Sequence, residues 1–207
     1  MKVKKVLCCE CMTGFYMDDK EAIKAGAKSD GFIYKGEPLT AGFKTIRQPG
    51  VAVSVMFVLE NGEIAYGDCS VAQYAASGGR EVPNTGKALM DVIEKYVVPY
   101  FEGKDITEFK ATAEQFDKKL FDGHQLPASI RYGVTQAVLE TVAKTNKCTM
   151  TEVIMKEYKL PLDLTPVRIN AQSGDERYTN VDKMILKKVG MKPSIILVTH
   201  EFHQDCL

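Results

Sequence analysis

Two β-branched runs joined by an Asn-Gly pair constrain the fold of this chain more than any other feature. The first run covers residues 51–59 and the second residues 64–69, with Asn61 and Gly62 between them. Asn-Gly is the strongest short hairpin signal, because both central residues of a two-residue turn favour a positive φ. Residues 3–9 form a further apolar run. We therefore predict that the chain opens with a small antiparallel sheet.

Apolar residues recur at helical spacing in the segments that follow the hairpin. The apolar positions of the first predicted helix cover residues 88–97, and the helix is expected to end near Gly103. The second predicted helix is expected to begin with Thr107 as its cap and to end at Gly123. Pro127 is expected at the first position of the third helix. The predicted buried faces of the second and third helices comprise Phe109, Ala113, Phe116 and Leu120, and Ile130, Val134, Ala137, Val138, Thr141 and Val142.

A fourth, short helix is predicted from a capping-box pattern, Thr149-Met-Thr-Glu152, in which each end residue bonds the backbone of the other. A hairpin followed by a helical bundle is typical of the α+β class. We therefore expect residues 1–160 to form one α+β domain.

The pattern changes in residues 160–166, where two prolines mark a linker. A strand over residues 167–171, a helix over residues 179–189 and a strand over residues 194–198 then predict one βαβ unit with parallel strands. A complete (β/α)₈ barrel needs about 250 residues. Residues 161–207 are therefore expected to be the start of an incomplete barrel.

The overall charge excludes one class of function. Lys plus Arg and Asp plus Glu number 27 each, so no positive surplus exists to neutralise phosphates, which argues against nucleic-acid binding. The longest apolar runs are far shorter than the roughly 20 residues that span a bilayer. The N-terminus lacks the apolar core of a signal peptide. We expect a cytoplasmic protein that binds a small molecule and no membrane.

Six cysteines raise the question of a metal site. Cys8, Cys9 and Cys11 crowd one segment, but no further Cys or His pair follows at zinc-binding spacing, and His124 stands alone. We therefore predict reduced thiols, as is usual in the cytoplasm, and assign no metal ligand in this chain.

Two glutamines are candidate binding residues. Gln73 follows the hairpin in a Gly-rich stretch that also contains Arg80, whose guanidinium suits a carboxylate. Gln172, followed by Ser173-Gly-Asp175, comes at the end of the predicted strand, where barrel active sites lie. The alternative for the stretch around Gln73 is a Gly-rich turn in which Arg80 is solvated. The alternative for Gln172 is a side chain that bonds the backbone of its own turn.

Two further segments stand out. Gly133, inside a predicted helix, costs about 1 kcal/mol relative to alanine, so we expect close helix packing at Arg131-Tyr132-Gly133. Residues 13–49 are polar and Gly-rich and too long for a simple connection. They are a candidate lid over a ligand.

Five strings, in order along about residues 1–190, resemble the methylaspartate ammonia-lyase family of the enolase superfamily. They are Thr13-Gly-Phe-Tyr-Met-Asp-Asp19, Gly67-Asp-Cys69 with Gln73-Tyr74 and Gly78-Gly-Arg80, Ile130-Arg-Tyr-Gly-Val-Thr-Gln136, Ala171-Gln-Ser-Gly-Asp175, and Asn180-Val-Asp-Lys-Met-Ile185. The resemblance implies an enolase-type capping domain followed by a TIM-type barrel. It also implies a homodimer when the enzyme is full length.

The resemblance implies elimination of ammonia from L-threo-3-methylaspartate to give mesaconate, in bacterial glutamate fermentation. Removing a proton next to a carboxylate builds a dianionic enolate, which enolase-type sites stabilise with Mg²⁺; K⁺ is the family's activator. Gln73 and Gln172 match substrate-binding glutamines of the family. No catalytic residue is carried over, because the lysine base and metal-binding carboxylates lie on later barrel strands.

The resemblance stops near Gly190, and residues 191–207 are atypical. Ser194 stands where the family has a histidine after a proline, here Pro193. We hypothesise a frame slip or a truncated gene, and resequencing the gene beyond codon 207 tests this. We expect no mesaconate from this chain alone, as followed by ultraviolet absorbance with Mg²⁺ and K⁺ present.

Two alternatives stay open at this stage. One is another enolase-superfamily activity, a cycloisomerase or an epimerase, which would not be expected to share the strings around Gln73 and Gln172. The other is a non-catalytic module that binds a partner through an open sheet edge at residues 194–198.

Overall fold

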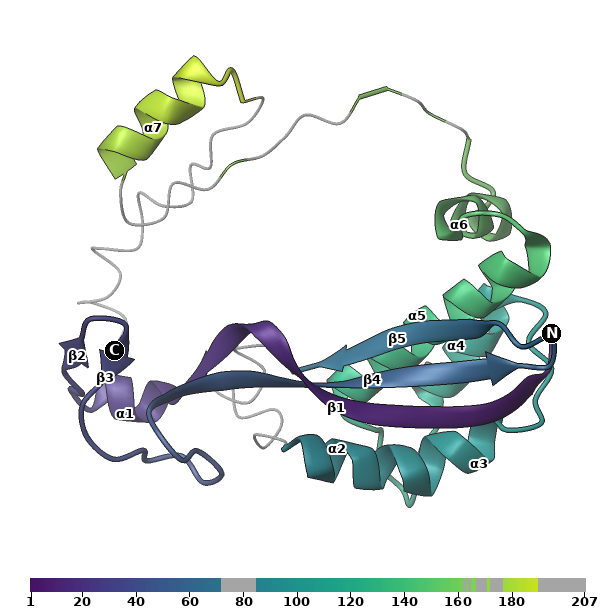
Figure 1. Ribbon diagram of the computed structural model, residues 1–207, viewed down its shortest axis with the longest axis horizontal. Coiled ribbons are helices and arrows are strands. Elements are labelled where there is room, and N and C mark those ends of the chain that lie inside the picture. Colours follow the sequence, from purple (N-terminus) through teal and green to yellow (C-terminus); the bar gives the residue numbers. More distant parts are fainter. Residues whose placement is uncertain (72–84, 162, 164, 167–170, 172–176, 190–207) are drawn as a thin grey trace. The chain divides into compact units, whose positions relative to one another are not determined.

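A computed structural model of the 207-residue chain shows two compact units, Met1–Pro161 and Leu162–Leu207. The structure describes residues 1–71, 85–161, 163, 165–166, 171 and 177–189 (Figure 1).

Three antiparallel strands form the main sheet of the first unit, in the order β1-β4-β5 (Figure 1). They are β1 (Val3–Asp18), β4 (Arg47–Leu59) and β5 (Ile64–Ser70). The predicted hairpin and the predicted first strand are confirmed. However, β1 continues well beyond the expected residues 3–9, because a second stretch of it pairs with the start of β4.

The turn between β4 and β5 corrects one detail of the prediction. The Gly62 amide donates to the Leu59 carbonyl (3.0 Å) and the Leu59 amide donates to the Glu63 carbonyl (2.8 Å). Among the residues of this loop only Gly62 has a positive φ, 87°. This pattern is a three-residue loop, a turn followed by a left-handed glycine, rather than a two-residue turn. The Asn61 side-chain oxygen accepts the Glu63 amide (3.0 Å), which closes the loop without a second left-handed residue.

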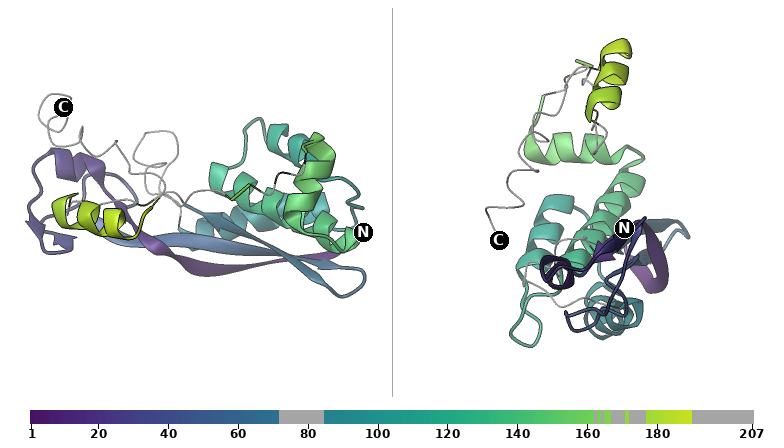
Figure 2. Two further views of the ribbon diagram at one scale, coloured as in Figure 1. Left: turned by 90° about the horizontal axis from the view of Figure 1, so that it is seen from above. Right: turned by 90° about the vertical axis from the view of Figure 1, so that its left-hand side faces the viewer.

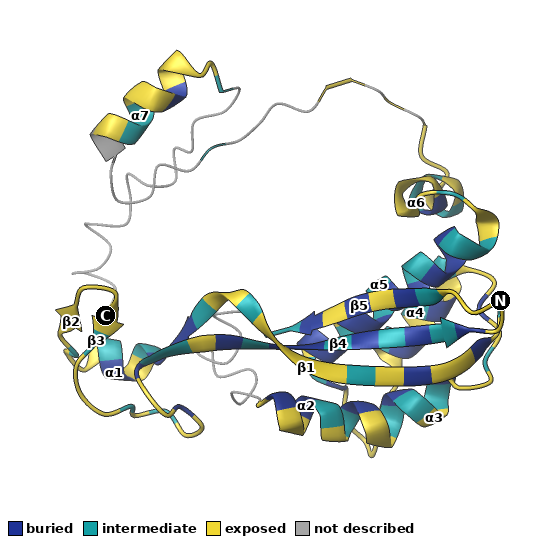
Figure 3. Cartoon of the chain, in the orientation of Figure 1, coloured by how far each residue is buried: buried dark blue, intermediate teal, exposed yellow. Residues whose placement is uncertain are grey.

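The core lies on one face of this sheet, as the alternation of burial along β4 shows (Figure 3). Val53, Val55, Phe57 and Leu59 are fully buried, while the residues between them stay partly exposed. Strand side chains alternate between faces, so one face of the strand packs against the helices. The same β4 residues belong to one apolar cluster with residues of α2 (Gly86–Val92), α4 (Phe109–Lys118), α5 (Ala128–Asn146) and α6 (Met150–Tyr158).

The first predicted helix is confirmed, including its end near Gly103, and it contains a π turn that was not predicted. It runs through α2, the π segment η2 (Ile93–Val97) and α3 (Val98–Phe101), and Gly103 follows with a positive φ of 80°. Pro99 has no amide hydrogen and its ring crowds the carbonyl of Lys95, so the regular i→i−4 bond is impossible there. The Val98 amide bonds Ile93 instead, and a π bulge is the usual outcome of such a break.

The start of α4 overturns the prediction that Thr107 caps this helix. The residue before the helix is Glu108, and no side chain of its own segment caps it. Instead Glu157 of α6 accepts the amides of Phe109 (2.8 Å) and Lys110 (2.5 Å). A tertiary contact therefore replaces the local cap. Leu120, predicted on the buried face, is 58% exposed because the helix ends at Lys118.

The buried stripe of α5 is confirmed in full: Ile130, Val134, Ala137, Val138, Thr141 and Val142 are all buried. Pro127 precedes the helix as its N-cap instead of occupying its first position, a difference of one residue that is common at helix ends. The predicted capping box between Thr149 and Glu152 is also present.

A row of polar side chains on α5 bonds the outer edge of β5. Gln136 accepts the Asp68 amide (3.4 Å), Glu140 accepts the Tyr66 amide, and Lys144 donates to the Ile64 carbonyl. These three side chains lie four residues apart and so share one helix face. Because an unpaired strand edge invites pairing with other chains, this row protects the end of the sheet.

Two glycines allow α5 to lie directly against β5, as predicted for Gly133. A Cβ built on Gly133 would lie 2.6 Å from the Cys69 amide nitrogen, and one on Gly67 would lie 1.8 Å from the Gly133 carbonyl oxygen. Backbone therefore packs on backbone at this point, which no larger residue permits.

In the second unit the structure describes one helix, α7 (Arg177–Leu186), which falls where residues 179–189 were predicted to be helical. The two strands expected on either side, residues 167–171 and 194–198, lie outside the described residues except for Ala171. The start of a barrel therefore stays a prediction. Among the described helices, none combines the length and the apolar character needed to cross a membrane.

We predict that Gly133→Ala destabilises the protein by about 3 kcal/mol, because the added methyl group collides with rigid backbone. The collision outweighs the gain of about 1 kcal/mol in helix propensity. Urea unfolding followed by circular dichroism measures the effect. Gly14→Ala is the matched control, since a Cβ added at Gly14 meets no atom within 4 Å; equal unfolding midpoints for the two variants would contradict the backbone contact.

Candidate functional site

Both glutamines predicted to bind substrate, Gln73 and Gln172, lie outside the described residues. The same holds for Arg80 and for the turn from Ser173 to Asp175. Their roles therefore stay predictions.

The described part of the string that contains Gln73, namely Gly67-Asp-Cys69, is structural. Gly67, Asp68 and Cys69 lie within β5 and not in a loop after it. The Cys69 thiol is fully buried and contacts the Ile130 carbonyl (3.9 Å). Burial, with a smaller contribution from the Asp68 carboxylate, raises the pKa of Cys69 to about 12. Since the thiolate is the reactive form of cysteine, Cys69 is a packing residue.

Arg131-Tyr132-Gly133 is structural too, as expected. Arg131 donates from Nη1 to the Asp117 carboxylate (2.6 Å) and from Nε to the Leu126 carbonyl (3.0 Å). The first bond joins α5 to α4 and the second joins α5 to the connection before it, and Gly133 contacts β5.

The candidate lid, residues 13–49, is the described segment that stands apart from the helix-covered sheet, and we call it the arm. It contains the end of β1, α1 (Lys20–Lys24), the short strands β2 (Ser29–Asp30) and β3 (Ile33–Tyr34), and the start of β4. The left view of Figure 2 shows β1 and β4 continuing past the helices to carry these elements. Sequence reasoning expected a loop here, whereas the structure has ordered secondary structure.

Asp19 is the centre of the arm. Its side chain is fully buried and caps α1, with the Glu21 and Ala22 amides at 3.2 and 3.4 Å. The other side of the arm also bonds it: the Leu39 amide (2.6 Å), the Thr40 amide (2.8 Å) and the Thr40 hydroxyl (2.6 Å). One carboxylate thus ties together two segments about 20 residues apart in sequence.

The pKa of Asp19 reflects this environment. Burial by itself raises it, but the bonds from the Thr40 hydroxyl and from the amides of Thr40, Leu39 and Ala22 outweigh burial. The net result is a pKa below the ordinary value for aspartate. Hydrogen bonds to the charged form stabilise that form.

Arg47 and Asp18 form a second tie, between the paired ends of β1 and β4. The guanidinium makes a two-point contact with the carboxylate, at 2.7 Å from Nε and 2.8 Å from Nη2. Both side chains are largely buried. Nη1 also donates to the Phe32 carbonyl (2.8 Å), so the same arginine anchors the β2–β3 hairpin.

Aromatic rings surround this arginine. Its guanidinium carbon lies 3.9 Å from the ring centre of Tyr16, 4.7 Å from Phe32 and 5.0 Å from Tyr34. Such contacts stabilise a cation further when water is excluded. Four apolar side chains of the arm are exposed: Phe15, Phe32, Ile33 and Leu39. Phe32 contacts Arg47 directly, Phe15 and Ile33 are next in sequence to the other two aromatic residues around Arg47, and the Leu39 amide bonds Asp19.

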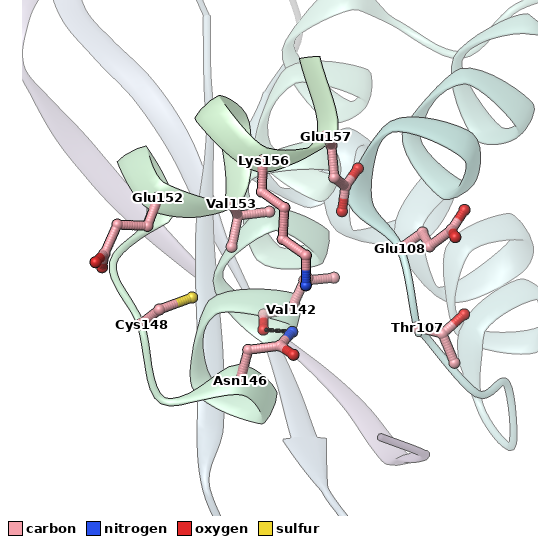
Figure 4. Close-up of a pocket in the computed structure, with 9 residues that line it drawn as sticks. All are labelled: Thr107, Glu108, Val142, Asn146, Cys148, Glu152, Val153, Lys156 and Glu157. Atoms are coloured by element: carbon pink, nitrogen blue, oxygen red, sulfur yellow. Dashed lines mark hydrogen bonds between the residues drawn. The ribbon is translucent and has the colours of Figure 1, made fainter. Parts of the chain in front are cut away.

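A pocket of about 430 Å³ lies between α5, α6 and the segment before α4 (Figure 4). Three of its polar side chains bond the protein itself: Glu157 caps α4, Glu152 closes its own capping box, and Asn146 donates to the Val142 carbonyl (2.8 Å). We therefore regard this pocket as a packing feature.

The thiols of Cys8, Cys9, Cys11, Cys69 and Cys148 are free. Within the described part of the chain, no group of three or more His, Cys, Asp or Glu side chains is arranged to hold a metal ion. The described residues that stand out as a candidate functional element are therefore those of the arm.

Sequence reasoning missed Asp18, Asp19 and Arg47 as organising residues. A local signal did exist for Asp19, because an aspartate followed two residues later by a glutamate is typical of a helix start. No local signal pairs Asp18 with Arg47, which are brought together only by the pairing of β1 with β4.

Comparison with known proteins gives a consistent picture. The chain matches the family described as "Methylaspartate ammonia-lyase N-terminus" over residues 1–159. It is 49% identical over 197 residues to a methylaspartate ammonia-lyase of Clostridium tetanomorphum, which is 95% of this chain and 48% of that protein. The chain spans about half the length of the curated relatives it matches.

Solved structures agree. A β-methylaspartase from Clostridium tetanomorphum, a Mg complex, has a TM-score of 0.85 at 50% identity, covering 91% of this chain and 46% of that one. A methylaspartate ammonia-lyase from Citrobacter amalonaticus, containing (2S,3S)-3-methylaspartic acid, has a TM-score of 0.84 at 43% identity, with 91% and 46% coverage.

We predict that Asp19→Asn lowers the free energy of local opening of the arm by at least about 2 kcal/mol. The cap contributes about 1 kcal/mol, and each buried amide left without an acceptor costs about 1–3 kcal/mol. Exchange of the Leu39 and Thr40 amides with deuterium, followed by NMR, measures this. Asp30→Asn is the control in the same arm, since Asp30 is exposed and only pairs with Lys35 (3.1 Å).

The same carboxylate gives a pH prediction. A lowered folded-state pKa contributes stability that is present above the unfolded pKa and lost as pH falls through the folded pKa. The protection of the arm amides from hydrogen exchange, corrected for the pH dependence of intrinsic exchange, should therefore be constant near pH 7 and fall below about pH 4. In Asp19→Asn this protection should not change with pH. A pH profile of Asp19→Asn that matches the wild-type profile would rule out this assignment.

Proposed function

The chain belongs to the methylaspartate ammonia-lyase family, and on that premise we propose that residues 1–160 form the substrate-capping domain of an enzyme that eliminates ammonia from L-threo-3-methylaspartate. The product of that reaction is mesaconate. Two observations carry the proposal. The family model matches residues 1–159, and the chain is 43–50% identical to methylaspartate ammonia-lyases of known structure.

We propose that Gln73 and Gln172 hold the substrate. A glutamine amide donates from nitrogen and accepts at oxygen, so it suits both a carboxylate and an ammonium group. Two such amides from separate segments would fix an amino diacid so that the C–H next to one carboxylate and the C–N bond are held in a defined geometry. The presence of 3-methylaspartic acid in the Citrobacter amalonaticus structure supports this substrate class.

We propose that residues 161–207 begin a TIM-type barrel of the enolase superfamily. The position of Gln172 after an apolar run supports this, since barrel active sites gather residues that follow strand ends. A homodimeric assembly, activation by K⁺ and a cytoplasmic location belong to the same proposal.

Mg²⁺ is a separate matter. The Clostridium tetanomorphum structure is a Mg complex, and Mg²⁺ prefers several oxygen ligands in octahedral geometry. The described residues do not offer such a set.

We predict that the 207-residue protein binds 3-methylaspartate, and that Gln73→Ala and Gln172→Ala each weaken binding by about tenfold or more. Losing one good hydrogen-bonding group in a buried site costs about 1.4 kcal/mol or more, which is a factor of ten. Isothermal titration calorimetry with Mg²⁺ and K⁺ present measures the affinity.

Gln115→Ala is the matched control, because Gln115 is an exposed residue of α4. Two results would reject the assignment: no binding by the wild-type protein, or equal weakening by Gln115→Ala and the two site variants. Methylsuccinate, which differs from 3-methylaspartate only by lacking the amino group, should bind more weakly than 3-methylaspartate if both amides act as proposed.

A further inference from the structure

The arm has a hydrophobic core of its own. Met17 and Phe43 form a buried cluster that is separate from the large cluster under the sheet. Ala22 and Ile46, also in the arm, are buried as well. A segment with its own core and its own polar ties has the properties of a unit that keeps its shape when it moves.

A weak joint connects the arm to the sheet. Met12 pairs with Val51 and Tyr16 with Pro49, so three residues of β1, 13–15, face only Gly50. Pro49 has no amide hydrogen to give to the ladder. Within the bulge the Thr13 hydroxyl donates to the Phe15 carbonyl and accepts from the Phe15 amide, both at 3.3 Å.

Gly50 makes this joint possible. A Cβ built there would lie 2.2 Å from the Thr13 hydroxyl oxygen and 3.1 Å from the Phe15 carbonyl oxygen. The β1 chain thus arches over β4 at the bulge, where Figure 1 shows it rising away from the sheet. A bulge bends a strand and interrupts its ladder.

The joint lies beside the end of β5. Val71 directly follows that strand, its amide donates to the Val51 carbonyl (3.1 Å), and its side chain packs against both hydrophobic clusters. Val71 therefore links the small core of the arm to the end of the sheet.

We propose that residues 16–49 are a preassembled cap that pivots as one body about the bulge at residues 13–15, and that Asp18, Asp19 and Arg47 are positioning residues that hold it assembled. The inference rests on the proposed function in one respect only, namely that the molecule covered by the cap is an amino diacid. A cap already folded before the substrate arrives loses little conformational entropy on closing, and such preorganisation strengthens binding.

The pivot is tested by residual dipolar couplings of the full 207-residue chain in weakly aligning medium. Arm amides should fit one alignment tensor of their own, smaller in magnitude than that of the sheet amides, because a hinge motion averages the couplings. A single shared tensor for arm and sheet would overturn the pivot. Arm couplings that fit no common tensor would overturn the rigid cap.

The positioning role is tested with Asp19→Asn and Arg47→Lys. In Asp19→Asn, arm amides should exchange about thirtyfold faster or more, and their couplings should no longer fit one tensor, while the sheet amides are unchanged. Arg47→Lys keeps the charge but not the two-point contact, so a smaller effect is expected. Equal acceleration in arm and sheet would show a general loss of stability and overturn the assignment.

Adding 3-methylaspartate separates this inference from the proposed function. If both hold, the ligand brings the arm tensor closer in magnitude to the sheet tensor. If the ligand has no effect on the arm tensor while the arm still has its own tensor and still depends on Asp19, the pivoting rigid cap is supported. The assignment of this cap to 3-methylaspartate is then wrong.

Discussion

The contact between Gly67 and Gly133 is the constraint on which the rest of the first unit depends. It brings the backbone of α5 onto the backbone of β5, closer than any side chain allows. At this separation the polar side chains of α5 bond the outer edge of β5. The same approach buries the Cys69 thiol, so a segment whose residue types suggest chemistry serves packing instead.

The arm solves a different physical problem. It is too small to bury much apolar surface, and small units generally need additional ties to hold a fold. Here the ties are polar: a buried carboxylate that accepts five hydrogen bonds and a two-point ion pair surrounded by aromatic rings. Such bonds depend on geometry, so they fix a shape more strictly than a loose apolar contact does. The arm is therefore well defined although its small core is distinct from the main core under the sheet.

Sequence reasoning succeeded where the determining contacts are local. The hairpin, the Thr149 capping box and the buried stripe of α5 follow from residues within a few positions of one another. It failed where a distant residue takes over a local role: Glu157 caps α4, so Thr107 is not needed. The π turn is an intermediate case, since Pro99 is a local signal whose consequence depends on how the surrounding helices pack. The placement of Gln73 and Gln172 is not tested by the described residues.

By itself, the sequence determined the α+β class, the main strands and helices of the first unit outside residues 13–49, and the family. These follow from periodicity, turn chemistry and matching strings, which are properties of neighbouring residues. Tertiary structure alone decided that residues 13–49 fold into an arm, because Asp19 meets Thr40, and Asp18 meets Arg47, only after β1 pairs with β4. Hydrogen bonds and ion pairs act over a few ångströms, so partners distant in sequence leave no pattern that a single chain reveals.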